Sequence, residues 1–174
     1  VASFSILGDV VQQIGGERVH VQNLVGADAD SHAYQLTGAD IKKIASAKLV
    51  LLNGLGLEKA DVIRAIKQAN VPYAEASAGI QALSSEEDEH GHHDHDHGEF
   101  DPHVWHDPVL MQKYAANVTA ALIKADPSGA KYYQQRFKAY SAKLVELDKF
   151  AQQQFASVLP ERRKVLTGHD SFHY

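Results

Sequence analysis

Cysteine is absent from the 174-residue chain, which excludes a disulfide framework, thiolate metal sites and thiol catalysis. Any transition metal must therefore be held by nitrogen and oxygen ligands. Long apolar runs are missing too: no stretch of about 18 uncharged apolar residues occurs, so we expect no membrane span. The chain lacks an initial methionine with a basic and apolar leader, and its start, VASFSILGD, is as expected of a mature protein after signal removal.

Clustered positive charge is also scarce. The formal net charge is −5, and residues 86–101 contain eight acidic side chains and no Lys or Arg. The remaining residues carry 14 acidic and 17 basic side chains, and these are interspersed along the sequence. Because there is no basic cluster and no alternation of basic with aromatic residues, we expect no nucleic-acid partner.

The hydrophobic pattern predicts an α/β fold. Short apolar or alternating segments typical of strands occur at residues 1–4, 18–25, 48–53 and 71–76. Segments with apolar residues at helical spacing separate them. This order predicts a parallel sheet with flanking helices, which forms an N-terminal lobe over residues 1–126.

The second half of the chain begins with two typical helix starts, Asp107-Pro108 and Asp126-Pro127, in which aspartate caps the helix and proline follows. Apolar residues spaced by three or four then predict a long linking helix over residues 127–159, roughly 45 Å in length. KVLTG and the turn after it, within residues 160–174, predict the first strand and ligand turn of a second α/β lobe, which is truncated in this chain.

A histidine-rich window occupies residues 86–106 and holds seven of the eleven histidines. Its first part, within about residues 84–99, lacks apolar residues and is predicted to be a mobile loop. The alternatives for this loop are secondary metal binding and an inert solvated linker. Binding there should be weak, because the loop loses conformational entropy when it wraps a metal. The candidate secondary ligands are His90, His92, His93, His95 and His97.

Three other histidines lie where secondary structure begins or ends. His32 lies in a polar loop after a predicted strand, His103 precedes a capped helix, and His169 follows the predicted strand KVLTG. Taken alone, His103 is better explained by a structural role and His32 by an exposed loop position. Open α/β sheets, however, collect ligand-binding groups at the carboxyl ends of their strands. Three neutral imidazoles in one crevice are typical of a tetrahedral zinc site that a carboxylate or water completes.

Four motifs give the chain a family resemblance. Residues 101–108 read DPHVWHDP, residues 30–36 read DSHAYQL, residues 167–174 read TGHDSFHY and residues 53–58 read NGLGLE. In these motifs the chain resembles the cluster A-I metal receptors, the solute-binding proteins of bacterial ABC importers, and in particular the zinc-binding ones. The family pattern D-P-H-x-W-x-D-P is matched throughout, whereas the D-P-H-x-Y-E-P pattern has serine at position 31 and lacks its Glu-Pro. The resemblance spans essentially the whole chain.

The resemblance implies that His32, His103 and His169 are the metal ligands. It favours zinc over manganese, because manganese receptors of the family tend to carry glutamate at the third position and imidazole suits zinc better. It also implies a fourth ligand, an aspartate or glutamate of the C-terminal lobe. Glu58 and Asp170 are candidate hydrogen-bond acceptors for ligand histidines, although a plain helix-start acid is an equally good interpretation of Glu58.

The function that the resemblance implies is a periplasmic receptor, not an enzyme, that captures Zn²⁺ and delivers it to an ABC permease in the membrane. A periplasmic metallochaperone is a candidate second partner. One alternative is a zinc buffer or chaperone that acts through the histidine-rich loop. Another is a zinc hydrolase whose open coordination position activates water, but the sequence has no H-E-x-x-H motif.

Overall fold

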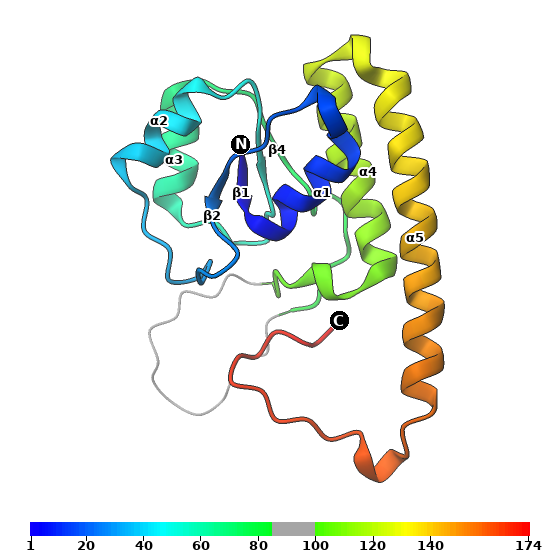
Figure 1. The fold of residues 1–174 in the computed structure, drawn as a ribbon. Coiled ribbons are helices and arrows are strands. Elements are labelled where there is room, and N and C mark those ends of the chain that lie inside the picture. The colour runs from blue at the N-terminus through cyan, green and yellow to red at the C-terminus, as the bar shows by residue number, and fades with distance from the viewer. Residues whose placement is uncertain (85–99) are drawn as a thin grey trace.

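The computed structural model describes residues 1–84 and 100–174. Its centre is a four-stranded sheet in the order β2-β1-β3-β4 (Figure 1). Every neighbouring pair is parallel: Ala2 lies beside Asn23 on one side and Leu51 on the other, and Val50 lies beside Tyr73. The predicted parallel α/β sheet is therefore confirmed. The strands are β1 (Ala2–Phe4), β2 (Asn23–Val25), β3 (Val50–Leu52) and β4 (Tyr73–Glu75).

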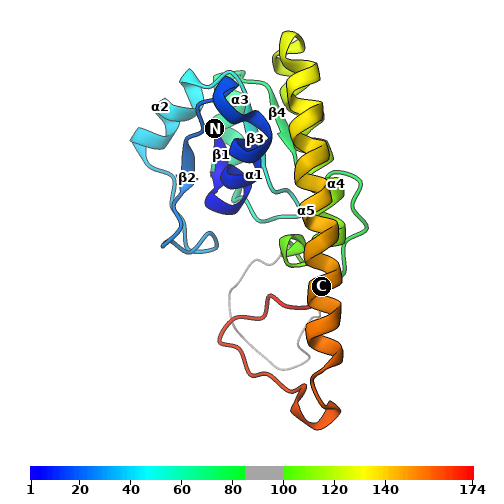
Figure 2. The same cartoon turned by 45° about the vertical axis from the view of Figure 1, so that its right-hand side comes forward.

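Helices cover both faces of the sheet. One face packs against α1 and α4 through residues such as Leu7 and Tyr114, and the other packs against α2 and α3 through Ile44 and Ile66. Helix α5 lies along α4 and α1 (Figure 2). No helix in residues 1–84 or 100–174 combines the length and hydrophobicity needed to cross a membrane. The helices are α1 (Ser5–Gly15), α2 (Gly38–Ser46), α3 (Ala60–Ala69), α4 (Pro108–Ala125) and α5 (Ala130–Ala156), with short 3-10 turns at η1 (Gly16–Arg18), η2 (Val104–His106), η3 (Pro127–Gly129) and η4 (Pro160–Arg162).

Two of the helix starts follow from local sequence. At α2 the Thr37 hydroxyl accepts from the backbone N–H of Asp40, while the Asp40 carboxylate accepts from the N–H of Thr37, which is a complete capping box. At α4 the Asp107 carboxylate accepts from the N–H of Val109 at 2.6 Å, and Pro108 occupies the first helical position. The cap predicted at Asp107 is confirmed.

Asp126 does not cap the long helix, which corrects the prediction made for it. Its carboxylate instead accepts from the guanidinium of Arg18 at 2.8 Å, from the hydroxyl of Tyr133 at 2.7 Å and from that of Ser128. With the carboxylate engaged in this way, the chain makes the 3-10 turn η3 first and α5 begins at Ala130. Its 27 residues span about 40 Å and end before the predicted boundary.

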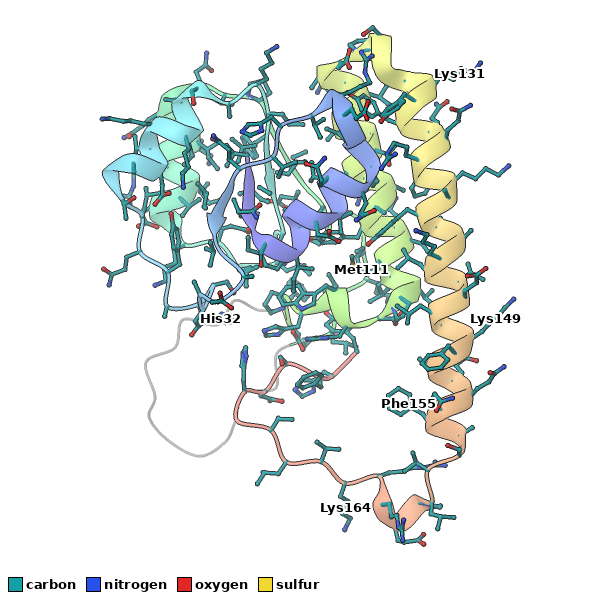
Figure 3. The ribbon with its side chains drawn as sticks, in the orientation of Figure 1. His32, Met111, Lys131, Lys149, Phe155 and Lys164 are labelled. Atoms are coloured by element: carbon teal, nitrogen blue, oxygen red, sulfur yellow. The ribbon has the colours of Figure 1, made fainter. Side chains whose placement is uncertain are left out.

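Two predicted strands also differ from the structure. Residues 18–21 are not part of the sheet, and β2 is confined to Asn23–Val25, with the carbonyl of Gln22 accepting from the N–H of Ala2 at 2.9 Å. Residues 164–168 form no strand: Val165 is 84% and Leu166 is 99% exposed. A strand requires a neighbour that satisfies its backbone groups, and none of the described segments pairs with this one. The C-terminal tail (residues 164–174) instead returns from the end of α5 toward the lobe (Figure 3).

Candidate metal site

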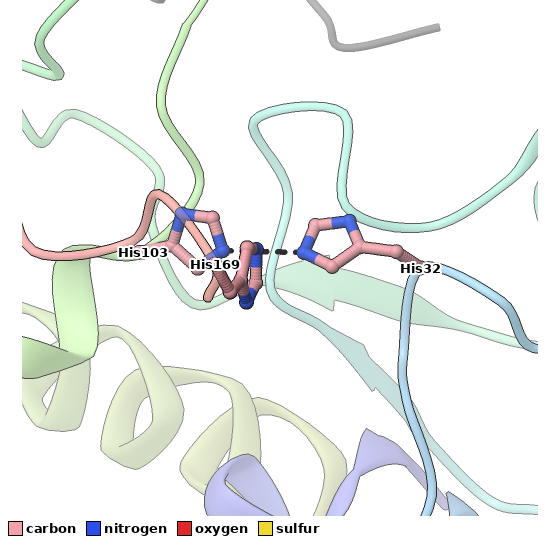
Figure 4. A group of neighbouring side chains, drawn as sticks. All are labelled: His32, His103 and His169. Atoms are coloured by element: carbon pink, nitrogen blue, oxygen red, sulfur yellow. Dashed lines mark hydrogen bonds between the residues drawn. The ribbon is translucent and has the colours of Figure 1, made fainter. Parts of the chain in front are cut away.

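His32, His103 and His169 come together at one place, as Figure 4 shows. His32 lies in the loop after β2, His103 directly precedes η2, and His169 lies in the C-terminal tail. One ring nitrogen of each lies within 4.8 Å of the other two. The ring centroids are 4.9 to 5.3 Å apart. Three segments that are far apart in the sequence thus supply three imidazoles to a single point.

The distance between two of these nitrogens matches the geometry of a shared metal. Nε2 of His32 and Nε2 of His103 are 3.1 Å apart. Two nitrogens that bind one tetrahedral zinc at about 2.0–2.1 Å lie about 3.3 Å from each other. The pair is therefore already at nearly the separation that a tetrahedral ion requires.

His103 is held in place by Asp101. His103 is 3% exposed, and one carboxylate oxygen of Asp101 lies 2.7 Å from its Nδ1 and 2.9 Å from its backbone nitrogen. A carboxylate at Nδ1 places the proton on that nitrogen and leaves the Nε2 lone pair directed at the metal position. Asp101 was not among the predicted site residues. The signal was its spacing of two residues before His103, which suits a bond from its side chain to the histidine backbone N–H.

The same spacing, with the same bond from the histidine backbone N–H to an aspartate side chain, recurs at His32. The backbone N–H of His32 donates to the carboxylate of Asp30 at 2.8 Å, and this bond lowers the pKa of Asp30. Asp30 therefore fixes the loop through the backbone, whereas Asp101 also contacts the ligand ring.

A buried amide connects the His103 segment to the sheet. The side chain of Asn53, fully buried at the end of β3, donates to the carbonyl of Pro102 at 3.1 Å and accepts from the hydroxyl of Tyr114 at 3.0 Å. Trp105 packs against Phe4 of β1 with ring centroids 5.0 Å apart. These contacts give the NGLGLE motif a structural role near the histidines. Its Asn53 side chain bonds the carbonyl of Pro102, directly before His103, and so fixes the backbone there.

Glu58 has different partners from those predicted. Its carboxylate accepts from the hydroxyl of Ser3 at 2.6 Å and from the backbone N–H groups of Asn53 at 2.6 Å and Gly54 at 3.0 Å. Burial raises its pKa. Glu58 thus organises the turn after β3, since the donors to its carboxylate come from Ser3, Asn53 and Gly54 and not from a histidine ring.

Asp170 is highly exposed and contacts Nε2 of His173 at 2.7 Å rather than His169.

His106 lies outside the three-histidine group and packs against the ring of Phe172, with centroids 4.6 Å apart. Burial lowers the pKa of both His103 and His106, which favours the neutral imidazole that binds metals. The loop histidines at positions 90–97 lie outside the described residues.

Comparison with known proteins gives one family over the whole chain. The model of the family described as zinc-uptake complex component A, periplasmic, matches residues 1–174. A manganese ABC transporter substrate-binding lipoprotein of Streptococcus anginosus is 30% identical over all of this chain and 57% of its own length. A zinc-binding protein of Treponema pallidum is 33% identical over all of this chain and 54% of its own length. The chain thus spans little more than half the length of these curated relatives.

The fold is shared with solved structures as well. The manganese-bound periplasmic metal-binding protein of Candidatus Liberibacter asiaticus superposes with a TM-score of 0.79 at 34% identity. The match covers 93% of this chain and 58% of that one. Both sequence and structure therefore point to proteins whose names describe metal binding.

Proposed function

The chain belongs to the periplasmic zinc-uptake component A family of metal-binding substrate-binding proteins of ABC importers, and from this membership we propose that it captures a divalent metal outside the cytoplasm. The metal is the cargo, bound by His32, His103 and His169. A membrane permease and its ATPase are the partners that receive it. The observation that supports this best is the convergence of three imidazole nitrogens within 4.8 Å of one another.

Zinc is the metal that we propose for this site. The three side chains offer nitrogen donors, which suit zinc, whereas manganese prefers sites rich in oxygen. The Nε2 separation of 3.1 Å between His32 and His103 also fits a small tetrahedral ion. A carboxylate or water completes the coordination. Because several similar proteins are named for manganese and one solved structure holds it, manganese is the competitor that a test must include.

A receptor is favoured over a hydrolase or a buffer. The relatives named above are binding proteins, and the three-histidine group is formed by residues of the folded lobe and its tail. A buffer that works through the histidines at positions 90–97 depends on residues outside the described ranges. It predicts several weak equivalents of zinc instead of one tight equivalent.

Titration of zinc against a chelator, with and without excess manganese, separates these functions. We expect the wild-type chain, and a variant that lacks residues 86–99, to bind one tight zinc that manganese does not displace. His103→Ala should lose this equivalent, while the matched variant His20→Ala, at an exposed histidine away from the site, should keep it. Tight zinc binding by His103→Ala would contradict the assignment, and preferential binding of manganese would overturn the choice of zinc.

A further inference from the structure

The tail that carries His169 has little structure of its own to hold the histidine in place. Residues 164–168 form no helix or strand, and Leu166 is 99% exposed. A chain segment of this kind loses conformational entropy when it is fixed at a metal. Some contact between the tail and the lobe must therefore restrict His169 before the metal binds, if the site is to be tight.

Tyr174 makes such a contact. Its hydroxyl donates to the backbone carbonyl of Asp101 at 2.7 Å and accepts from the backbone N–H of Leu83 at 3.1 Å. These two residues are themselves joined, since the N–H of Asp101 donates to the carbonyl of Leu83 at 2.9 Å. One oxygen thus ties the end of the tail to the residue whose side chain orients His103.

The surroundings of the tyrosine support a fixed position. Its ring packs against the hydrophobic core of the lobe, and Ser171, between it and His169, is only 5% exposed. Burial raises the pKa of Tyr174, so the hydroxyl keeps the proton that it donates. His169 and Tyr174 are five positions apart and so lie at most about 18 Å from each other along an extended chain, and an anchor at Tyr174 therefore limits how far His169 can move from the site.

We propose that Tyr174 is a positioning residue for the metal site, whose hydroxyl holds the tail against Leu83 and Asp101 so that His169 meets His32 and His103. This inference rests on the proposed function. Tyr174 does not touch the metal: it acts through His169. Removing the hydroxyl should therefore weaken metal binding only while His169 is present.

Tyr174→Phe removes the hydroxyl and keeps the ring. We expect it to weaken zinc binding about fivefold or more, which is the low end of the scale for two lost hydrogen bonds, and to change the visible spectrum of bound cobalt(II), which reports coordination geometry. In a His169→Ala background the same substitution should cause no further loss. The matched control is Tyr73→Phe, at a tyrosine that is 46% exposed in β4 and distant from the site, and it should bind zinc like the wild type.

Two results would overturn the role of Tyr174: zinc affinity of Tyr174→Phe equal to that of the wild type, or an equal loss with and without His169. The thermal unfolding midpoint of the metal-free variant should stay near that of the wild type, because the ring still packs. A large decrease in that midpoint would mean that the tyrosine is merely structural. Failure of the proposed function gives a different pattern, in which the wild-type chain itself shows no tight zinc that depends on His103.

Discussion

His103 and His169 are the same side chain in opposite settings. His103 is buried in the lobe and hydrogen-bonded to Asp101. The residue before it, Pro102, is hydrogen-bonded to Asn53 at the end of β3. His169 is exposed on a tail without regular secondary structure. One side of the site is thus built by the fold, and the other is delivered by a segment that must be ordered. The comparison teaches that equal ligands need not contribute equally to affinity, because ordering a free segment costs entropy.

The first way to break this comparison is to remove each histidine in turn. A structural zinc site is worth about 10–16 kcal/mol over four ligands, so one ligand corresponds on average to roughly a hundredfold in affinity, and a ligand whose segment must first be ordered to less. We expect His103→Ala to weaken zinc binding by about a thousandfold, because it also leaves the buried Asp101 without its partner. His169→Ala should cost roughly thirtyfold. Chelator competition measures both, and equal losses would show that the tail histidine is as well preorganised as the buried one.

The second prediction concerns the two aspartates that precede ligand histidines. Asp101→Asn should weaken zinc binding by about 10–100-fold, because an amide no longer fixes the proton on Nδ1 of His103. Asp30→Asn is the matched control. Its described contact is to the backbone N–H of His32, which an amide oxygen can still accept, so the loss should be a fewfold at most. Similar losses in the two variants would mean that the ring contact of Asp101 has no special part in binding.

The third prediction concerns acid. Burial is the largest influence on His103 and lowers its pKa below the ordinary value of 6.5, with Asp101 opposing the change. Below about pH 6.5 the unfolded chain therefore takes up a proton that the folded lobe resists, and the free energy of unfolding decreases as the pH falls. Urea denaturation of the metal-free chain between about pH 7 and pH 5.5 should show this decrease, and His103→Gln should show a smaller one. If the free energy of unfolding decreased with pH by the same amount in His20→Gln and His103→Gln, the buried ring of His103 would not be the source of the decrease.

The smallest effect should come from the tail. Leu166→Ala is expected to change the free energy of unfolding by less than about 0.5 kcal/mol, because this side chain is 99% exposed. Urea denaturation at neutral pH measures the change. A loss of more than about 1 kcal/mol would mean that residues 164–168 pack as the strand that their sequence suggests.

Local sequence was sufficient for the parts of the fold whose contacts are local. The caps at Thr37 and Asp107 use neighbours within three residues, and the apolar runs of the strands alternate between the two faces of the sheet. Asp126 could not be predicted in this way, because its partner Arg18 lies 108 positions away. KVLTG has the composition of a strand, but composition does not supply a partner strand.

The candidate site likewise combines features that local sequence signals with contacts that depend on distant segments. The three histidines could be identified from motifs, and the Asp101 contact could have been found from its spacing to His103. The bond from Ser3 to Glu58 and the contacts of Tyr174 depend on which segments the sheet and the tail bring together, and no nearby residue signals them. Sequence thus indicated which side chains meet, while the structure shows what holds them.

The most direct test of the central claim is X-ray absorption at the zinc edge, recorded on the zinc-loaded chain without residues 86–99 so that the loop histidines contribute nothing. The site described here predicts three imidazole nitrogens at about 2.0–2.1 Å together with one further light ligand. In His169→Ala the spectrum should show two imidazole ligands instead of three. A first shell made of oxygen atoms, or an imidazole count that His169→Ala leaves unchanged, would contradict a site shared between the buried lobe and the tail.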